Sequence, residues 1–156
     1  MDIVKNTEKI DAILNHTDSF IKGFFYGYRW LSNFHVCDVF YDGMMYPSSE
    51  AAYQSAKSED PYIKEIFQKL TPREAQKHGK VIKCRDDWEN IKKDVMYKVL
   101  LDKFTRHDDL MMKLIETGDK YLEETNYWND KTWGVCNGKG NNWLGELLMI
   151  VRKDIQ

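Results

Sequence analysis

The chain has 156 residues, of which 42% are hydrophobic and 31% charged, and its net charge is −2. This composition excludes intrinsic disorder, the near-neutral charge argues against a dedicated DNA-binding protein, and no apolar run approaches the roughly 18 residues of a membrane helix. The first residues also carry an acid where a signal peptide carries a base. We therefore expect one cytoplasmic domain over residues 1–156 with no membrane association.

The N-terminal part predicts one helix and one hairpin. A short helix is expected over residues 7–14, and the aromatic stretch 20–28, interrupted by glycines, favours strand or irregular structure. Residues 35–46 predict an antiparallel hairpin, because Asp42-Gly43 is a turn pair that tolerates a positive φ.

Three helix starts follow closely. Ser48 or Ser49 caps a helix that is expected to run to about Ser58. Asp60-Pro61 begins a second helix, and Thr71-Pro72 begins a third, which Gly79 ends. The second helix is predicted to place four apolar residues on one side, namely Ile63, Ile66, Phe67 and Leu70.

The C-terminal half is also mainly helical. Residues 87–104 carry a wide apolar stripe at the helical period, a further helix around Leu110 ends at Gly118, and a last helix covers residues 143–152. Residues 121–140 predict a loop with one short strand. The expected fold class is α+β, a single helix-dominated domain with a small antiparallel element near its N-terminus.

Metal and disulfide chemistry have no support in the pattern. Cys37, Cys84 and Cys136 lie about fifty residues apart without CxxC spacing, and the four histidines are scattered. Such a pattern is typical of reduced thiols, so we expect no protein metal site and no cofactor. Residues 64–106 hold twelve Lys/Arg against seven Asp/Glu. This local excess of +5 favours an anionic ligand, such as a phosphate or nucleotide, or is an ordinary solvated helix face.

Candidate chemistry lies in three places. Glu50, Tyr53 or Gln54, and Lys57 share one helix face, which is either a reactive face or a surface salt-bridge stripe. Trp88 opens the long helix as a core residue or as a stacking platform for a flat ring. No Ser-His-Asp or Cys-His arrangement follows from spacing, so acid–base work would fall to the carboxylates of Glu50 and Asp130.

The third place is the segment from Trp128 to Gly145. Asp130 opens it, and glycine and asparagine occupy five of the six positions from 137 to 142, immediately before the last predicted helix. Such a backbone bends easily, and amides at the start of that helix would suit a phosphate. The segment matches neither a P-loop nor a dinucleotide-binding glycine motif.

These segments resemble the NADAR superfamily, also called YbiA-like, over about residues 20–153. The resemblance is carried by Leu31-Ser32-Asn33-Phe34, Asp42-Gly43-x-x-Tyr46-Pro47-Ser48-Ser49-Glu50-x-Ala52-Tyr53-Gln54-x-x-Lys57, Arg85-x-x-Trp88, Asp130-x-x-Trp133-Gly134 and Gly140-x-Asn142-x-Leu144-Gly145. Ala51 stands where relatives commonly have a histidine.

The resemblance implies an N-glycosidase that cleaves a base–ribose bond in a phosphorylated, nucleotide-like small molecule. The substrate is either an early riboflavin-pathway intermediate or ADP-ribose on guanine, the latter in nucleobases or nucleic acid. It further implies catalytic positions at Glu50, Trp88 and Asp130. Lys57 would contact phosphate or form a Schiff base with the opened ribose. The substrate-binding positions would be Asn33, Tyr53, Gln54, Trp133, Gly134 and Asn142.

Two alternatives belong to other functional classes. One is a catalytically silent module that binds ADP-ribose or a related NAD derivative, and the other is a protein-interaction domain. The presence of both Glu50 and Asp130 favours the enzyme, because a binding module would not require two such carboxylates.

Overall fold

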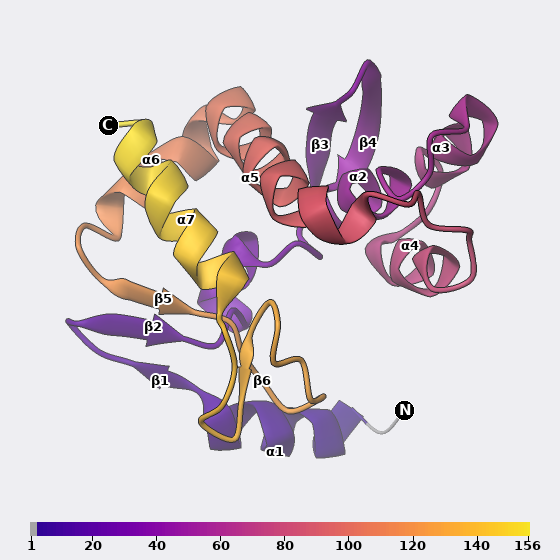
Figure 1. The fold of residues 1–156 in the computed structure, drawn as a ribbon. Coiled ribbons are helices and arrows are strands. Elements are labelled where there is room, and N and C mark those ends of the chain that lie inside the picture. Colours follow the sequence, from indigo (N-terminus) through magenta and orange to yellow (C-terminus); the bar gives the residue numbers. More distant parts are fainter. Residues whose placement is uncertain (1–2) are drawn as a thin grey trace. The chain divides into compact units, whose positions relative to one another are not determined.

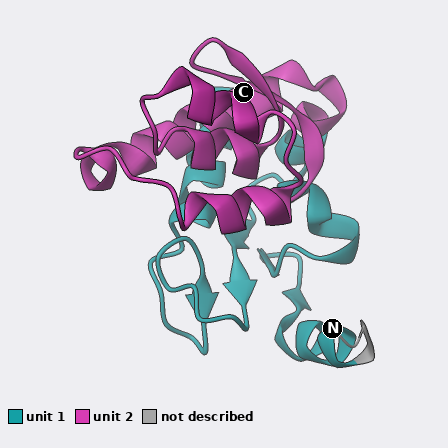
Figure 2. Ribbon diagram, turned by 90° about the vertical axis from the view of Figure 1, so that its right-hand side faces the viewer, with its two compact units in different colours: residues 1–32, 113–156 teal, residues 33–112 magenta. Residues whose placement is uncertain are grey.

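The computed structural model describes residues 3–156. The chain divides into two compact units (Figure 2). The first unit comprises residues 1–32 and 113–156, and the second comprises residues 33–112. Helix α6 (Asp108–Glu116) runs from the second unit into the first. Within residues 3–156, no helix is both long enough and apolar enough to cross a membrane.

The first unit is built around a three-stranded sheet (Figure 1). Strands β1 (Asn15–His16) and β2 (Phe20–Lys22) are antiparallel, whereas β2 pairs in parallel with β5 (Tyr121–Glu123). Two residues at the centre of that parallel pair, Ile21 and Leu122, are almost completely buried. Helix α7 (Trp143–Asp154) packs on β5 through Leu144, Leu148 and Val151, its most buried side chains, and this forms the core of the unit.

Smaller elements complete the first unit. Helix α1 (Ile3–Ile13) precedes β1, and the 3₁₀ helix η1 (Tyr26–Leu31) follows β2. Strands β6 (Thr125–Asn126) and β7 (Val135–Cys136) form a short parallel pair. The loop between β6 and β7 carries Asp130.

The second unit contains the predicted hairpin. Strands β3 (Val36–Tyr41) and β4 (Met44–Ser48) are antiparallel, and Asp42 and Gly43 both have positive φ, as a tight two-residue turn requires. The long helix α5 (Trp88–Arg106) lies along β3. Its side chains reach the outer edge of the strand, where Asp102 accepts the Phe40 N–H at 2.7 Å. Beyond the end of α5, His107 Nε2 donates to the Asp38 carbonyl at 2.7 Å.

Three short helices connect β4 to α5, and each has the side-chain cap that its sequence predicts. They are α2 (Ser49–Ser55), α3 (Pro61–Phe67) and α4 (Pro72–Gly79). Ser48 accepts the Ala51 N–H, Asp60 that of Tyr62, and Thr71 that of Glu74. Helix α2 packs against both α4 and α5, and every residue of α2 is buried.

The α+β class and most helices are confirmed, while several local predictions are wrong. Helix α2 ends at Ser55 and not near Ser58. Residues 121–140 contain three short strands in place of one: β5 pairs with the distant β2, whereas β6 and β7 pair with each other within this segment. On α3, Phe67 is fully buried but Ile66 is 44% exposed, so the predicted apolar face is narrower than expected.

Candidate active site

The Glu50 carboxylate lies in a buried environment on α2. Ala51 and Ala52 are completely buried, and such small side chains allow α2 to pack closely against its neighbours. Glu50 itself is only 7% exposed. The Gln54 Nε2 donates to Glu50 Oε1 at 2.8 Å, one helical turn away. The part of the predicted face that contains Glu50 and Gln54 therefore exists, and it is buried and is no solvated salt-bridge stripe. Lys57 lies beyond the end of α2 and is not on this helix.

Several buried polar atoms around Glu50 have no hydrogen-bond partner among the residues that the structure describes. They are Asn33 Oδ1, Ser49 Oγ and Gln54 Oε1. Asn33 adjoins Glu50 through its backbone carbonyl, which accepts the Glu50 N–H at 3.1 Å. Burying a polar atom without a partner costs free energy, so such a group is typical of a site that a ligand or water completes.

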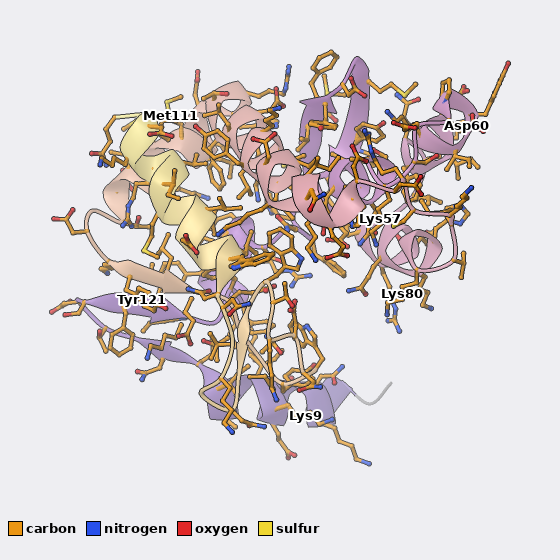
Figure 3. The ribbon with its side chains drawn as sticks, in the orientation of Figure 1. Lys9, Lys57, Asp60, Lys80, Met111 and Tyr121 are labelled. Carbon is orange, nitrogen blue, oxygen red and sulfur yellow. The ribbon has the colours of Figure 1, made fainter. Side chains whose placement is uncertain are left out.

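Lys57 follows α2 and lies beside a segment that joins α4 to α5. Its Nζ donates to the Gly79 carbonyl at 3.2 Å, and its own carbonyl accepts the Arg85 N–H at 2.7 Å. Figure 3 labels Lys57 together with Lys80, the residue after α4. Burial lowers the pKa of the Lys57 ammonium, while negative charge at Cys84 and Glu50 opposes that shift. Lysines 80 and 92 lower this pKa further, because each brings another positive charge nearby.

Trp88 is a packing residue of the same unit. Its ring centroid lies 5.1 Å from that of Tyr53 with an interplanar angle of 53°, and the Trp88 side chain is only 5% exposed. The aromatic pair joins α2 to the start of α5. The structure therefore brings Asn33, Glu50, Tyr53, Gln54, Lys57 and Trp88 into one unit.

The remaining predicted site residues belong to the first unit. Asp130 Oδ1 accepts the backbone N–H groups of Thr132 and Trp133 at 3.1 and 3.0 Å. The Asn126 side chain bonds the Asp130 backbone from both sides, donating to its carbonyl and accepting its N–H. These bonds fix the β6–β7 loop. The Trp133 ring meets that of Trp143 edge-on at 5.6 Å.

Asn142 ties the glycine-rich loop to β5. Its Oδ1 accepts the Glu124 N–H at 3.0 Å, and its Nδ2 donates to the Leu122 carbonyl and the Tyr121 hydroxyl. The backbone carbonyl of Glu124 also leaves no room for a side chain at Gly134. Glycine is therefore needed at position 134 for close packing, a requirement that the predicted substrate-binding role of Gly134 did not include.

Most backbone amides at the start of α7 are already bonded within the chain, which argues against the expected phosphate site there. The amide of Trp143 already donates to the Thr132 carbonyl, and that of Leu144 donates to the Trp133 carbonyl. Amides that are bonded to carbonyls in this way have no remaining hydrogen for an anion.

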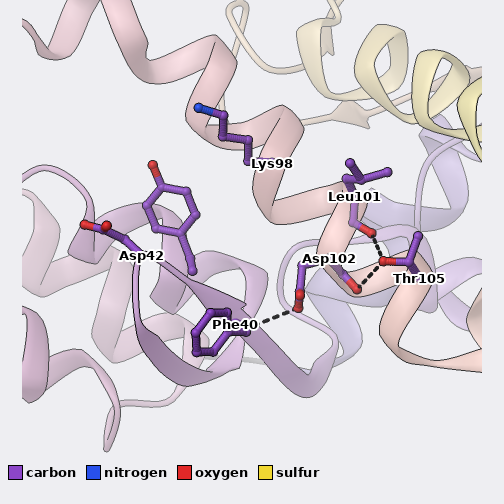
Figure 4. A pocket seen from close by; sticks show the side chains of 7 residues that line it. Phe40, Asp42, Lys98, Leu101, Asp102 and Thr105 are labelled. Carbon is purple, nitrogen blue, oxygen red and sulfur yellow. Dashed lines mark hydrogen bonds between the residues drawn. The ribbon is translucent and has the colours of Figure 1, made fainter.

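An open depression of about 460 Å³ lies between β3 and α5, away from Glu50 (Figure 4). It is lined by Phe40, Tyr41, Asp42, Lys98, Leu101, Asp102 and Thr105. Its charged groups already have partners, because Lys98 pairs with Asp94 and Asp102 with Arg106. It contains none of the predicted site residues, so it is a weak candidate for the reaction.

Sequence reasoning overlooked Gly79 as a site residue. The pattern assigned it only the end of α4, yet its carbonyl accepts the Lys57 ammonium. A contact between Lys57 and the end of α4 carries no local sequence signal, since the two residues lie 22 positions apart.

Comparison with known proteins places these residues in a family. The NADAR domain profile matches residues 20–156. The chain is 36% identical to N-glycosidase YbiA of Escherichia coli over 133 residues, covering 82% of each protein. It is 35% identical to an N-glycosidase of Nostoc punctiforme, with 83% of this chain and 86% of the relative covered.

A longer relative and a solved structure agree with this assignment. The chain is 33% identical to a riboflavin biosynthesis protein of Vibrio vulnificus, matching 81% of this chain but only 35% of that protein. The NMR structure of Escherichia coli YbiA superposes with a TM-score of 0.78 at 32% identity, covering 94% of this chain and 90% of YbiA. A profile match over most of the chain and this structural likeness lead to one conclusion: the chain belongs to the NADAR domain family.

Proposed function

We propose that this chain is an N-glycosidase that hydrolyses the bond between a nitrogen base and C1′ of a phosphorylated ribose. The substrate is a riboflavin-pathway intermediate or an ADP-ribosylated guanine. The names of the relatives support the reaction class. The observation that carries the proposal is the Glu50 carboxylate, which is buried, oriented by Gln54 and adjoined by polar atoms without partners.

The chemistry of the bond requires such a group. Breaking a C1′–N bond builds positive charge on the ribose, and a fixed carboxylate in a poorly solvated place stabilises that charge strongly. In this proposal Glu50 faces C1′ in the transition state. Gln54 keeps the carboxylate in one orientation, so that little reorganisation is needed during the reaction.

Lys57 has two roles that its surroundings support. Lysines 80 and 92 lie near enough to lower its pKa, and positive charge around Lys57 favours a substrate phosphate, although Lys92 is itself paired with Glu89 at 2.6 Å. The lowered pKa also increases the fraction of neutral amine, which is a nucleophile. In a covalent route this amine forms a Schiff base at C1′ of the opened ribose with departure of the protonated base. Water then hydrolyses the Schiff base, which restores the amine and releases the sugar phosphate.

A release assay tests the proposal. The purified chain is incubated with the pyrimidine ribose-phosphate intermediate of riboflavin synthesis and, separately, with guanine-ADP-ribosylated DNA, and the liberated products are quantified. We expect release from at least one substrate and its loss in Glu50→Gln. Glu59→Gln is the matched control, because Glu59 has a side chain that is 73% exposed and lies only nine positions later.

Two results contradict the proposal. Undiminished base release by Glu50→Gln would show that Glu50, the central residue of the proposal, is not required. Absence of release from both substrates, with ADP-ribose still bound, identifies the chain as a silent binding module.

A further inference from the structure

Gly79 has no conformational reason to be glycine. It is the last residue of α4, and it is not one of the glycines whose φ is positive. Its backbone is therefore open to any residue, and alanine has the higher helix propensity at such a position. Gly79 is also buried, so its lack of a side chain must be explained by what it contacts.

The contact is with the side chain that orients Glu50. A Cβ at position 79 would overlap Gln54 Oε1 and would lie 2.6 Å from Gln54 Cδ. The Gln54 amide is thus held between the Glu50 carboxylate, to which Nε2 donates, and the bare Cα of Gly79. The first two atoms that a Cβ would meet form the flexible end of the Gln54 side chain, so a substitution displaces this amide. Gln54 Cβ would lie 3.2 Å away, so α2 and α4 need to separate by only a few tenths of an ångström.

Gly79 also contacts the second reactive group. Its carbonyl accepts the Lys57 ammonium at 3.2 Å. One residue therefore contacts Lys57 through its carbonyl and the partner of Glu50 through its Cα.

We infer that Gly79 is a positioning residue for the proposed glycosidase reaction. This role rests on the proposed function: the bare Cα sets the place of the Gln54 amide and thereby the orientation of the Glu50 carboxylate. The Gly79 carbonyl accepts the Lys57 ammonium and holds it in place. Gly79 itself does not contact the reacting atoms.

The test is a double-mutant cycle of Gly79→Ala and Gln54→Ala, followed by base release and thermal unfolding. We expect Gly79→Ala to fold with a small decrease in the unfolding midpoint and to lower kcat by about a hundredfold, because small displacements of reactive groups cost this much. In the Gln54→Ala background the side-chain amide is absent, so the methyl group added at position 79 has no amide to displace. Gly79→Ala should then lower kcat no further, which is non-additivity typical of residues acting through one another.

Gly27→Ala is the matched control, since a Cβ at Gly27 meets nothing within 4 Å, and it should retain wild-type activity. Wild-type kcat in Gly79→Ala, or an equal loss in both backgrounds, overturns the inference.

A second readout is independent of activity. The side-chain amide resonances of Gln54 and the carboxyl resonance of Glu50 should shift in Gly79→Ala and remain in place in Gly27→Ala. Unmoved resonances overturn the role of Gly79. If the wild-type chain releases no base while these resonances do shift, the proposed function fails and the positioning contact stands.

Discussion

Substitutions of Asp130 can distinguish a structural role of its side chain from a chemical role in the reaction. Its Oδ1 accepts two backbone N–H groups, from Thr132 and Trp133, in a partly buried loop. Asp130→Ala leaves both donors without this acceptor. We expect it to lower the free energy of unfolding by about 2 to 3 kcal/mol, since a hydrogen bond to a charged group contributes about 1.5 kcal/mol or more and solvent replaces part of it. For a protein of this size, that loss corresponds to a decrease in Tm of about 4 to 12 °C.

Asp130→Asn is the informative partner substitution. Its side-chain oxygen still accepts the same two N–H groups, so Tm should fall by much less than in Asp130→Ala. Differential scanning calorimetry of both variants, with the exposed Asp18→Ala as control, measures the difference. The base-release assay on the same samples then assigns the role.

If Asp130 acts by holding the loop, Asp130→Asn keeps most of the activity. Full stability combined with loss of activity in Asp130→Asn would refute this reasoning and would identify the carboxylate as a reacting group. An unchanged Tm in Asp130→Ala would show that the two hydrogen bonds contribute nothing.

Three further predictions concern the second unit. Because burial lowers the Lys57 pKa, covalent trapping of substrate by borohydride should rise with pH over a range that lies below the pKa of a solvated lysine. Trapping should vanish in Lys57→Ala, and trapping that does not depend on pH would contradict this prediction. Asp102→Ala should lower the free energy of unfolding, measured by urea titration, by about 1 to 2 kcal/mol, because the Phe40 N–H loses its acceptor. An unchanged urea midpoint would argue against that contact. Thr71→Ala should lower the free energy of unfolding by about 1 kcal/mol through loss of the α4 cap, whereas Thr71→Ser should have a stability near that of the wild type. Equal effects of the two substitutions would exclude capping as the cause.

The parts of the fold that depend on local chemistry were predictable. Asp42-Gly43 specifies its turn through the backbone angles of two adjacent residues, and the α5 stripe extends over several helical turns. The pairing of Ile21 with Leu122 was not predictable, because each strand has only three residues and its partner lies about a hundred positions away.

The candidate site shows the same division. The bond between Glu50 and Gln54 follows from helical spacing, and the structure contains it. The role of Asn142 in bonding β5, and the contact of Gly79 with Gln54, depend on which segments pack together. A single sequence carries no signal for such approaches, so glycine and asparagine suggested a flexible loop where the structure has close packing.

The hydrogen bonds along the outer edge of β3 have a consequence for how this protein would aggregate. An uncovered strand edge recruits strands from other molecules, which is a common start of aggregation. Here Asp102 and His107 occupy the outward N–H of Phe40 and the outward carbonyl of Asp38, so a foreign strand finds both positions already filled. Protection of this strand edge thus depends on α5 remaining docked. Loosening of that helix should release a strand that templates association before the chain has globally unfolded.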